Sequence, residues 1–578
     1  MSKLRRPGSR DNVSIVLCGQ AGQGIQTIEF LLTKILKLAL YNVFATKEYM
    51  SRIRGGANST EIRVSSKPVR AFANGIDILI ALDRGALTHI QDRIAPQTVI
   101  LADKSDAGYE SQYPKCDLIY VPFTEIATQI GNKIYSNIVA VGTIAGLFDI
   151  DPGLVTNCIK RFFSAKSDHI IQRNTAAVRQ GLRIGAELLE SLKIRIEVDK
   201  DPAVADHILL SGTEAVALGA IAGGCNFLSA YPMSPSTSIM VFLAKHAEKF
   251  GIIVEQAEDE IAAMNMVIGA WYAGARAMAS TSGGGFSLMT EALSLAGMVE
   301  SPVVIHLAQR PGPATGLPTR TEQADLNLAL YAGHGEFPRI IFAPGKLEDG
   351  FYLTQKAFNL ADKYQLPVFI LTDQYFIDSY YNTPAFDLSA VKNEKHIIRT
   401  DPDYNRYHLT ENGISPRGIP GWGKGLVCLD SDEHDQAGHI TEDLALRMHM
   451  VDKRLKKAVS IKTETIPPEL TGPADYKNLV VCWGSTYNIV HEAVRNTSRD
   501  DLAFLHFKQL HPLHEATVDY LRKARKTIIV EGNATGQFAA LIKLQTGIDI
   551  ENRILKYNGL NFSVEELTES LKSLLDKE

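Results

Sequence analysis

Short apolar runs alternate with amphipathic stretches along most of this chain of 578 residues. An apolar run at residues 14–18 predicts a buried strand, and a glycine-rich turn follows at 19–24. The next stretch predicts a helix, because apolar residues recur with the spacing of one helix face: Ile25, Ile28, Leu32, Ile35 and Ala39. Further strands are expected at 42–46 and 76–83. This strand–helix–strand order favours a parallel, doubly wound sheet for residues 1–195.

The same pattern returns twice further along the chain. Residues 205–395 predict helices and four strands, the latter at 227–230, 252–254, 277–280 and 303–307. Residues 475–578 predict strands at 479–482, 502–505 and 527–530. Residues 396–474 are irregular and rich in Gly and Pro at first, and then predict a charged helix. We therefore expect an α/β protein with three doubly wound α/β units and one irregular connecting segment.

Polar loops follow the strands of the second unit. Residues 230–237 read Ala-Tyr-Pro-Met-Ser-Pro-Ser-Thr, and residues 255–260 read Glu-Gln-Ala-Glu-Asp-Glu. Residues 309–320 read Gln-Arg-Pro-Gly-Pro-Ala-Thr-Gly-Leu-Pro-Thr-Arg, and a glycine loop, Thr-Ser-Gly-Gly-Gly-Phe, occupies 281–286. Open α/β sheets bind ligands at the carboxyl ends of their strands. These loops therefore predict the rim of an active site.

Composition narrows the class of protein. The chain is 45% hydrophobic and 22% charged, with a formal net charge of -5. It has no basic excess to neutralise phosphates, so we expect no nucleic-acid partner. No uninterrupted apolar run reaches about 18 residues, and the basic first ten residues precede no apolar signal segment, so we expect no membrane span and a cytoplasmic location.

The cysteines and histidines give little sign of a metal. The six cysteines are widely spaced, contain no Cys-x-x-Cys pair and are expected to be reduced and buried: Cys18, Cys116, Cys158, Cys225, Cys428 and Cys482. His434 and His439, with nearby carboxylates, suggest either a metal site or a solvated loop. The loop is favoured because the spacing matches no helical zinc motif. We therefore predict no metal site on this chain.

The first glycine loop, Gly19-Gln-Ala-Gly-Gln-Gly24, allows two interpretations. Its spelling is not that of a dinucleotide-binding turn, and the next strand does not end in the expected acid. Bare N–H groups at a helix start still suit an anion. The alternative is a tight strand–helix turn without a ligand.

Taken together, the loops at 230–237, 255–260 and 309–320 closely resemble those of the α subunit of the 2-oxoacid:ferredoxin oxidoreductases, which are thiamine diphosphate enzymes. The loop at 19–24 and the stretch Arg52-Ile-Arg-Gly-Gly-Ala57 resemble that family's γ subunit. The resemblance implies a γ-type domain at 1–195, a thiamine pyrimidine-binding domain at 205–395 and a transketolase C-terminal-like domain at 475–578. In the family the γ domain lies over the coenzyme A end of the site.

That position makes the glycines and arginines of the two γ-like stretches candidates for binding coenzyme A: Gly22, Gly24, Arg54, Gly55 and Gly56. Arg52 and Arg54 could pair with its phosphates. The alternative for both arginines is a solvated surface pair.

The family's chemistry needs a carboxylate against the aminopyrimidine ring of the cofactor, so that the cofactor itself can take up a proton. Glu260 fits this role at the start of an apolar helix, and Glu258 is its rival. The glycine loop adds Gly283 and Gly284 as cofactor-binding candidates. The alternative for either glutamate is a carboxylate that only stabilises the helix start.

The resemblance also implies the residues that bind the substrate. The family spelling Tyr-Pro-Ile-Thr-Pro-Ser-Thr places a threonine against the 2-oxoacid, where this chain has Ser234, with Tyr231 and Thr237 on the same loop. An arginine is expected for the substrate carboxylate. The Thr-Gly-Leu-Pro-Thr-Arg spelling is similar to the 2-oxoglutarate-type and broad-specificity members, so Arg320 is favoured and Arg310 comes second.

Two features of a complete enzyme are missing. The chain has no Gly-Asp-Gly motif for the diphosphate and its Mg²⁺, and no clustered cysteines for a [4Fe-4S] cluster. In the family both belong to a β subunit, which also passes electrons to ferredoxin. The resemblance thus implies a γ–α subunit with half of an active site, which converts a 2-oxoacid and coenzyme A to acyl-CoA and CO2 with its β partner. A non-catalytic scaffold of the same fold and a nucleotide-dependent ligase or dehydrogenase are the alternatives.

Overall fold

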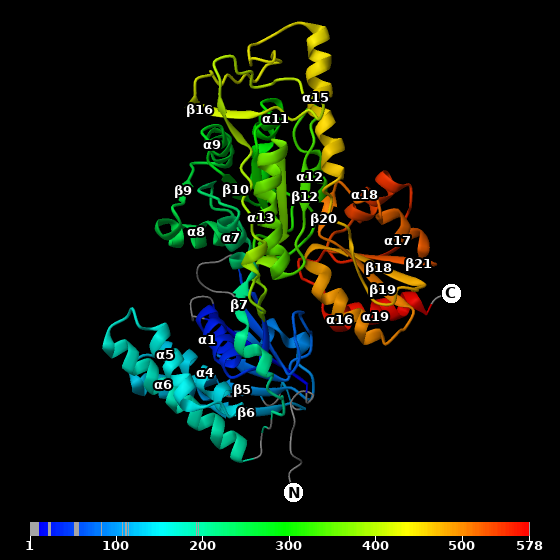
Figure 1. Cartoon of the computed structure of the whole chain (residues 1–578). Helices are drawn as coiled ribbons and strands as arrows, with labels where there is room; N and C mark the ends of the chain where they lie inside the picture. The colour runs from blue at the N-terminus through cyan, green and yellow to red at the C-terminus, as the bar shows by residue number, and fades with distance from the viewer. Residues whose placement is uncertain are drawn as a thin grey trace. The chain divides into compact units, whose positions relative to one another are not determined.

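The computed structural model describes residues 11–20, 25–50, 57–82, 84–106, 108–109, 112–113, 115–191, 194 and 196–576 (Figure 1). The chain divides into two compact units. Unit 1 contains Met1–Ser211, Asp378–Ala385 and Ser563–Glu565. Unit 2 contains Gly212–Ile377, Phe386–Phe562 and Glu566–Glu578. Both are built from sheets and helices, so the predicted α/β class is confirmed.

Unit 1 is built on an eight-stranded sheet with the order β6-β5-β4-β1-β3-β2-β14-β7. Its strands are β1 (Asn12–Gln20), β2 (Asn42–Glu48), β3 (Ala57–Ser65), β4 (Ile78–Ala81), β5 (Val99–Asp103), β6 (Asp117–Val121), β7 (Ile208–Ser211) and β14 (Tyr380–Thr383). Strands β1, β4, β5 and β6 are parallel. The other neighbours are antiparallel. The prediction of a parallel sheet for residues 1–195 is therefore wrong for the half of the sheet that contains β3 and β2.

The cause of that error is the strand β3, which pairs with β1 on one side and with β2 on the other. Its sequence is mostly polar, so it lacks the apolar run of a buried strand, yet Ser59, Thr60 and Glu61 are buried. Pairing with two neighbouring strands satisfies the backbone hydrogen bonds of β3. Arg93 donates a hydrogen bond to Glu61 Oε2 at 3.0 Å. Burial nevertheless raises the pKa of Glu61 to about 7, because Arg93 offsets only part of the desolvation.

The helices of unit 1 are α1 (Ile25–Leu38), α2 (Arg84–His89), α3 (Phe123–Ile130), α4 (Ser136–Leu147), α5 (Pro152–Phe162) and α6 (Asp168–Glu190). Helix α1 matches the predicted apolar spacing and buries Ile28, Leu32 and Ile35. Helices α4 and α6, cyan in Figure 1, approach each other very closely. A Cβ on Gly181 of α6 would lie only 2.1 Å from the carbonyl oxygen of Val139. Glycine is therefore required at this crossing.

Unit 2 contains a seven-stranded sheet with the order β20-β12-β13-β11-β10-β8-β9. The strands are β8 (Phe227–Ala230), β9 (Ile253–Gln256), β10 (Ala277–Thr281), β11 (Val303–Gln309), β12 (Ile340–Phe342), β13 (Pro367–Asp373) and β20 (Gln509–His511). All neighbours are parallel except β12 and β20. The associated helices are α7 (Gly212–Ala222), α8 (Thr237–Phe250), α9 (Glu260–Tyr272), α10 (Gly283–Phe286), α11 (Thr290–Met298), α12 (Leu326–Tyr331), α13 (Leu347–Tyr364) and α14 (Gln374–Asp378).

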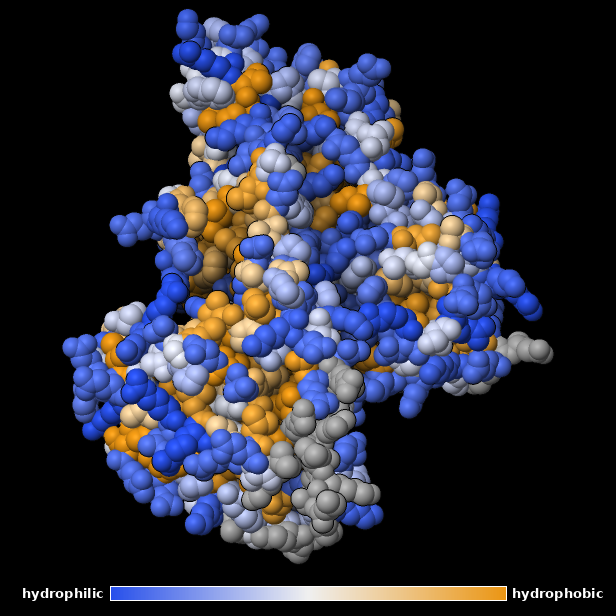
Figure 2. Space-filling model, turned by 60° about the horizontal axis from the view of Figure 1, so that its bottom comes forward, coloured by the Kyte–Doolittle hydropathy of each residue, from blue (hydrophilic) through white to orange (hydrophobic). Residues whose placement is uncertain are grey.

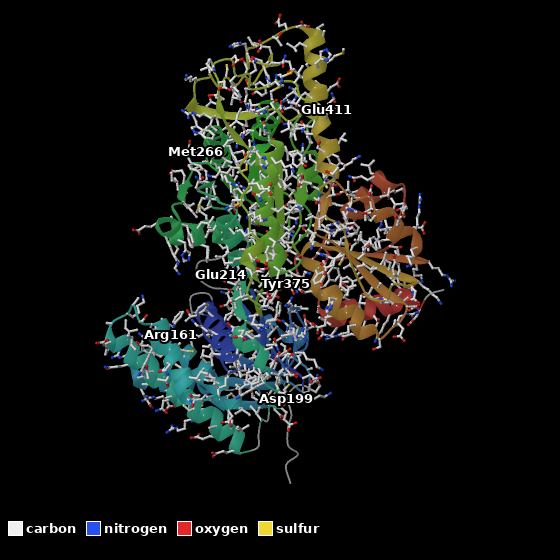
Figure 3. The ribbon with its side chains drawn as sticks, in the orientation of Figure 1. Arg161, Asp199, Glu214, Met266, Tyr375 and Glu411 are labelled. Atoms are coloured by element: carbon white, nitrogen blue, oxygen red, sulfur yellow. The ribbon has the colours of Figure 1, made fainter. Side chains whose placement is uncertain are left out.

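Side chains from the sheet and its helices fill the interior of unit 2 (Figure 3). Met266 of α9, labelled there, accepts a hydrogen bond from the Ser229 hydroxyl of β8 over 3.4 Å. His306 in β11 is buried, with its ring nitrogens 2.9 Å from Ser280 Oγ and Thr372 Oγ1. Burial lowers its pKa to about 3, so this histidine is a neutral link between neighbouring strands.

A five-stranded sheet with the order β17-β19-β18-β21-β22 completes unit 2. Its strands are β17 (Glu469–Thr471), β18 (Asn478–Trp483), β19 (Leu502–Phe507), β21 (Lys526–Glu531) and β22 (Asn552–Leu555). Its helices are α16 (Tyr487–Thr497), α17 (Thr517–Lys523), α18 (Gln537–Thr546) and α19 (Val564–Leu575). The connecting segment holds the strands β15 (Ile397–Thr400) and β16 (Arg417–Gly423) and the helix α15 (Leu444–Lys462), the expected charged helix.

Exposed apolar side chains mark several surfaces. On unit 1, the partly exposed rings of Phe30 and Phe162 lie 5.5 Å apart, and Figure 2 shows apolar residues in patches between polar ones. On α15 the usual pattern is inverted, because Lys453 and Lys457 are buried whereas Leu444 is 81% exposed. Met448 and Val459 are exposed as well. In the part of the chain that the structure describes, none of the helices combines the length and apolarity of a membrane span.

We expect Gly181→Ala to destabilise unit 1 by about 1–3 kcal/mol, because overpacking at a backbone contact forces the helices apart. Gly269→Ala is the matched control, since Gly269 also lies within a helix but has nothing within 4 Å of the new methyl group. That control should be neutral or slightly stabilising. Thermal unfolding and limited proteolysis of both variants measure the effect, and equal stability of the two would contradict the close crossing of α4 and α6.

Candidate active site

The site is built at the point where the seven-stranded sheet changes direction. Strand β8 lies between β9 on one side and β10 on the other, so the chain crosses to opposite sides after β8 and after β9. The carboxyl ends of β8, β9, β10 and β11 lie at one edge because these strands are parallel. Doubly wound sheets bind ligands at such a switch point. The loops that the sequence singled out all leave from this edge.

Glu260 is the first residue of α9, which follows β9. The preceding residue, Asp259, caps the helix by accepting a hydrogen bond from the Ala262 amide at 2.8 Å. Glu260 is therefore not needed as a cap. It is 3% exposed, and no described atom donates a hydrogen bond to its Oε1. Glu258, its rival in the sequence, is exposed.

The glycine loop after β10 closes over Glu260. A Cβ on Gly285 would lie 2.5 Å from Glu260 Oε1 and 2.3 Å from Thr281 Oγ1, so only glycine lets the carboxylate lie here. A Cβ on Gly284 would make only ordinary contacts, 3.5 Å from the Ala314 carbonyl oxygen and 4.0 Å from Met233 Sδ. The hydroxyl of Ser282 is buried and, within the described residues, has no hydrogen-bond partner. Two unsatisfied polar atoms, Glu260 Oε1 and Ser282 Oγ, thus belong to segments that pack against each other, which is unusual for a protein interior.

Asp325 faces the same loop and was not a candidate in the sequence. A Cβ on Gly283 would lie 2.5 Å from both Asp325 carboxylate oxygens, and Oδ2 is another buried atom without a described partner. Gln309 holds Asp325 in place, because its Oε1 accepts from the Asp325 amide at 3.0 Å and its Nε2 donates to the Thr372 carbonyl at 3.1 Å. The sequence gives only a weak signal for this pair. Gln309 begins the loop at 309–320, whereas Asp325 lies beyond that loop and reaches the site only through the fold.

Burial raises the pKa of Asp325 to about 7, and the nearby Glu322 carboxylate raises it further while Arg310 opposes the shift. Burial also lowers the pKa of Arg310, with Asp325 acting in the other direction. The site therefore combines a carboxyl group that changes charge near neutral pH with a cation close to it.

Arg310 joins two of the predicted loops. It is buried, and its Nη1 donates to the carbonyl oxygen of Ser234 at 2.6 Å. The loop after β11 is thus tied to the loop after β8. On that loop Ser234 and Thr237 are half-buried, and Tyr231 is exposed. Its Ser236 hydroxyl donates to the Met233 carbonyl at 2.7 Å, which braces the turn.

Arg320 lies further along the loop after β11, against another part of unit 2. Arg320 is half-buried, and a Cβ built on Gly559 would lie 3.2 Å from the Cβ of Arg320. The adjacent Thr321 amide donates to the Gly559 carbonyl at 3.1 Å, and the Thr321 hydroxyl donates to Asp373 Oδ1 at 3.3 Å. The structure thus connects Arg310 to the Ser234 loop by a direct hydrogen bond.

The remaining candidates are the residues proposed for coenzyme A and the two histidines. The residues proposed for coenzyme A lie outside the described residues: Gly22, Gly24, Arg52, Arg54, Gly55 and Gly56. His434 is buried against the ring of Tyr407, whereas His439 is exposed, so the two do not converge. The expectation of a solvated loop is therefore wrong for His434. Within the described ranges, no group of three or more metal-binding side chains comes together.

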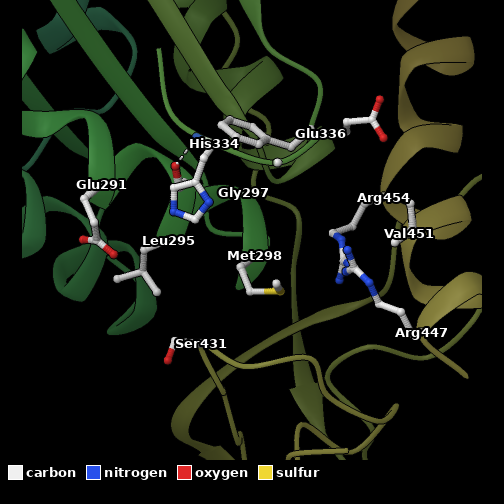
Figure 4. Close-up of a pocket in the computed structure, with 13 residues that line it drawn as sticks. Glu291, Leu295, Gly297, Met298, His334, Glu336, Ser431, Arg447, Val451 and Arg454 are labelled. Atoms are coloured by element: carbon white, nitrogen blue, oxygen red, sulfur yellow. Dashed lines mark hydrogen bonds between the residues drawn. The ribbon is translucent and has the colours of Figure 1, made fainter. Parts of the chain in front are cut away.

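A separate cavity of about 290 Å³ lies between α11, α15 and the segment around His334 (Figure 4). In Figure 4, Arg447 and Arg454 project from α15 across the cavity from Glu291. Both arginines form ion pairs with Glu433, and those from Arg454 measure 2.9 and 3.0 Å. Glu433 therefore offsets part of the positive charge that these two arginines bring to the cavity wall.

Similarity to known proteins identifies the family of this chain. Residues 218–453 match the family model described as "Pyruvate flavodoxin/ferredoxin oxidoreductase, thiamine diP-bdg", and residues 14–184 match "Pyruvate ferredoxin/flavodoxin oxidoreductase". A 2-oxoacid:ferredoxin oxidoreductase subunit alpha from Sulfolobus sp is 34% identical over 97% of this chain and 96% of the relative. The 2-oxoglutarate oxidoreductase subunit KorA of Mycobacterium tuberculosis is 27% identical over 98% of this chain and 92% of its own length.

Among solved structures, a 2-oxoglutarate:ferredoxin oxidoreductase from Magnetococcus marinus, with 2-oxoglutarate, coenzyme A and succinyl-CoA bound, matches with a TM-score of 0.90. It is 30% identical and covers 98% of this chain and 100% of its own. The fold and the matched family model are those of a thiamine diphosphate-binding class of protein. The chain belongs to the 2-oxoacid:ferredoxin oxidoreductase family, among its alpha subunits.

The raised pKa of Asp325 predicts a pH-dependent stability. The carboxyl group stays protonated in the folded chain up to about pH 7 but ionises near pH 4 when unfolded, so stability falls as pH rises between these values. An asparagine side chain cannot ionise, so the stability of Asp325→Asn relative to the unmodified chain should rise by about 1–2 kcal/mol from pH 4 to pH 8.

Thermal unfolding across that pH range measures this difference. Asp387→Asn is the control, because Asp387 is exposed and its pKa is lowered by hydrogen bonds from Ser389. The stability of Asp387→Asn relative to the unmodified chain should not change above about pH 5. A flat difference for Asp325→Asn as well would mean that Asp325 is solvated.

Proposed function

We propose that this chain is the γ–α subunit of a thiamine diphosphate-dependent 2-oxoacid:ferredoxin oxidoreductase that acts together with a β subunit. The reaction is the oxidative decarboxylation of a 2-oxoacid with coenzyme A, which yields acyl-CoA, CO2 and reduced ferredoxin. The observation that carries the proposal is Glu260, a buried carboxylate with an unpaired oxygen at the switch point of the second sheet.

The residues around Glu260 fit the aminopyrimidine end of thiamine diphosphate. Glu260 Oε1 and the Ser282 hydroxyl lack described partners, and the backbone at Gly284 is less crowded than at Gly283 and Gly285. Glu260 would accept a hydrogen bond from the aminopyrimidine ring. Because Gly283 and Gly284 lack side chains, the ring could approach their backbone. When bound, the cofactor supplies the carbon nucleophile and the electron sink for decarboxylation. The Glu260 carboxylate would share a proton with the ring. The apolar residues of α9 would keep water away from it.

The substrate would lie between the loops after β8 and β11. Ser234 offers a hydroxyl donor to the 2-oxoacid, with Tyr231 and Thr237 on the same turn, and the missing methyl group relative to threonine leaves more room. Arg310 already donates to the Ser234 carbonyl, which suits a positioning role. Arg320 is therefore our candidate for the substrate carboxylate, because a guanidinium binds carboxylates with two parallel hydrogen bonds.

A partner subunit supplies the rest of the proposed site. The sequence lacks both Gly-Asp-Gly and clustered cysteines, so Mg²⁺, the diphosphate site, the [4Fe-4S] cluster and the contact to ferredoxin belong to the β subunit in this proposal. The exposed apolar side chains of α15 are typical of a surface that another subunit covers. The first domain, with Gly22, Gly24, Arg54, Gly55 and Gly56, would bind coenzyme A. The cytoplasmic location stays a prediction.

A non-catalytic scaffold of the same fold is the second candidate. A scaffold gains nothing from a buried carboxylate with an unpaired oxygen, because such a group costs folding free energy. Natural sequences keep such costs mainly where a ligand or a reaction needs them. The unpaired oxygens of Glu260 and Asp325 therefore favour the enzyme.

In the complex with its β subunit, Glu260→Gln should lower kcat by about 10²–10⁴, the range for loss of an acid–base contribution. Glu258→Gln is the matched control, since this exposed glutamate lies two residues earlier, and its kcat should change little. Steady-state turnover and subunit co-purification measure both. If Glu258→Gln were the damaging change, the proposed role of Glu260 would be wrong.

Arg320→Lys should raise KM for the 2-oxoacid by about tenfold, because a point charge replaces a planar two-pronged donor. The KM for coenzyme A should stay unchanged. Arg447→Lys serves as a control, since Arg447 is an arginine of the same unit that pairs with Glu433. Equal changes in both KM values would indicate a loss of structure and not of substrate binding.

A further inference from the structure

A small cavity of about 20 Å³ lies at the carboxyl end of α9, next to the residues that precede β11, whereas Glu260 lies at the other end of α9. Arg406 and Arg417 line it together with Trp271 of α9 and the half-buried Leu429. A cavity of this size holds one water-sized species. Neither arginine is a candidate for the proposed function, so the cavity needs an explanation of its own.

Both guanidinium groups are buried and incompletely paired. Arg406 is 3% exposed, and its Nη2 donates to the Glu300 carbonyl at 2.8 Å, but its Nη1 has no described acceptor. Arg417 donates to the Trp271 carbonyl at 3.1 Å and to Asp362 Oδ1 at 2.5 Å, but its Nε has no described acceptor. No described carboxylate forms an ion pair with Arg406. Glu300 acts on Arg406 only from beyond ion-pair distance, and a buried charge without a paired counter-charge is strongly disfavoured.

The surrounding core has an excess of positive charge. Six cationic side chains are buried here, each at most 4% exposed: Arg276, Arg406, Arg417, Lys453, Arg454 and Lys457. Three carboxylates contact them, and each is shared between two cations. Glu300 pairs with Lys453 and Lys457 at 2.5 Å, Asp362 with Arg417 and Arg276, and Glu433 with Arg454 and Arg447. Glu394 adds only an exposed carboxylate near Arg276.

The titration of the neighbours agrees with a shortage of negative charge. Burial lowers the pKa of Lys457 to about 7 even though Glu300 opposes the shift, and Lys453 and Arg406 lower it further. Burial by itself would raise the pKa of Glu300, but the ammonium groups of Lys457 and Lys453 hold it far below its ordinary value. Several cations thus act on one carboxylate.

We propose that the cavity binds a small inorganic anion of halide size, with chloride as the physiological ligand, between Arg406 Nη1 and Arg417 Nε. The anion supplies the missing counter-charge and joins Arg406, on the irregular segment, to Arg417 of β16 and to the end of α9. It is a structural ligand that stabilises the packing of residues 396–474 against the second sheet.

The proposal is tested by thermal unfolding of the full chain in sodium chloride or bromide against sodium gluconate at equal ionic strength. Gluconate is too large for the cavity. We expect a saturable rise in Tm of about 1–3 °C with either halide, because a ligand that binds only the folded state stabilises it. Leu429→Glu places a carboxylate at the cavity and should abolish the halide effect while raising Tm in gluconate.

Leu426→Glu is the matched control, because Leu426 is exposed, lies on the same segment and does not line the cavity. It should keep the full halide effect. Crystals grown in bromide provide a second measurement that needs no variant, with an anomalous peak expected within hydrogen-bonding distance of both arginines. A halide effect that is equal in Leu429→Glu and Leu426→Glu, or the absence of the bromide peak, would overturn the proposal.

Discussion

The central constraint on this protein is the buried carboxylate of Glu260 at the point where the second sheet changes direction. Its Oε1 has no hydrogen-bond partner in the described chain, and the Gly285 backbone lies against it. An unsatisfied buried carboxylate oxygen costs free energy, so the fold must hold it there. Asp259 makes this possible by capping α9, which frees Glu260 from that role. The unpaired oxygen is thus available to a ligand.

The remaining parts of the site depend on that arrangement. Parallel pairing of β9, β8, β10 and β11 brings their loops to one edge, and Arg310 ties the loop after β11 to the loop after β8. Gln309 orients Asp325 against Gly283, which belongs to the same glycine loop as Gly285. Two carboxyl groups therefore face one short backbone segment from different elements. Elsewhere in unit 2, buried arginines and lysines exceed the carboxylates that contact them, which is the basis of the proposed anion site.

Much of this could be predicted from the sequence where local pattern and fold agree. The apolar run at 227–230 became β8 with the same bounds, and the acidic end of the next strand led to Glu260. Strand β3 was missed because its polar residues are buried between two strands, which no local pattern reports. Asp325 was missed because Gln309 and Gly283 place it from distant parts of the chain. The roles of the site residues stay predictions.

The most direct test is a crystal structure of the chain with its β subunit and thiamine diphosphate bound. The measurement is the distance from Glu260 Oε1 to the nearest nitrogen of the aminopyrimidine ring. Our account predicts a hydrogen bond of about 2.6–3.2 Å, with the ring over Gly284. A cofactor bound elsewhere, or a Glu260 oxygen that stays unpaired beside it, would contradict the account.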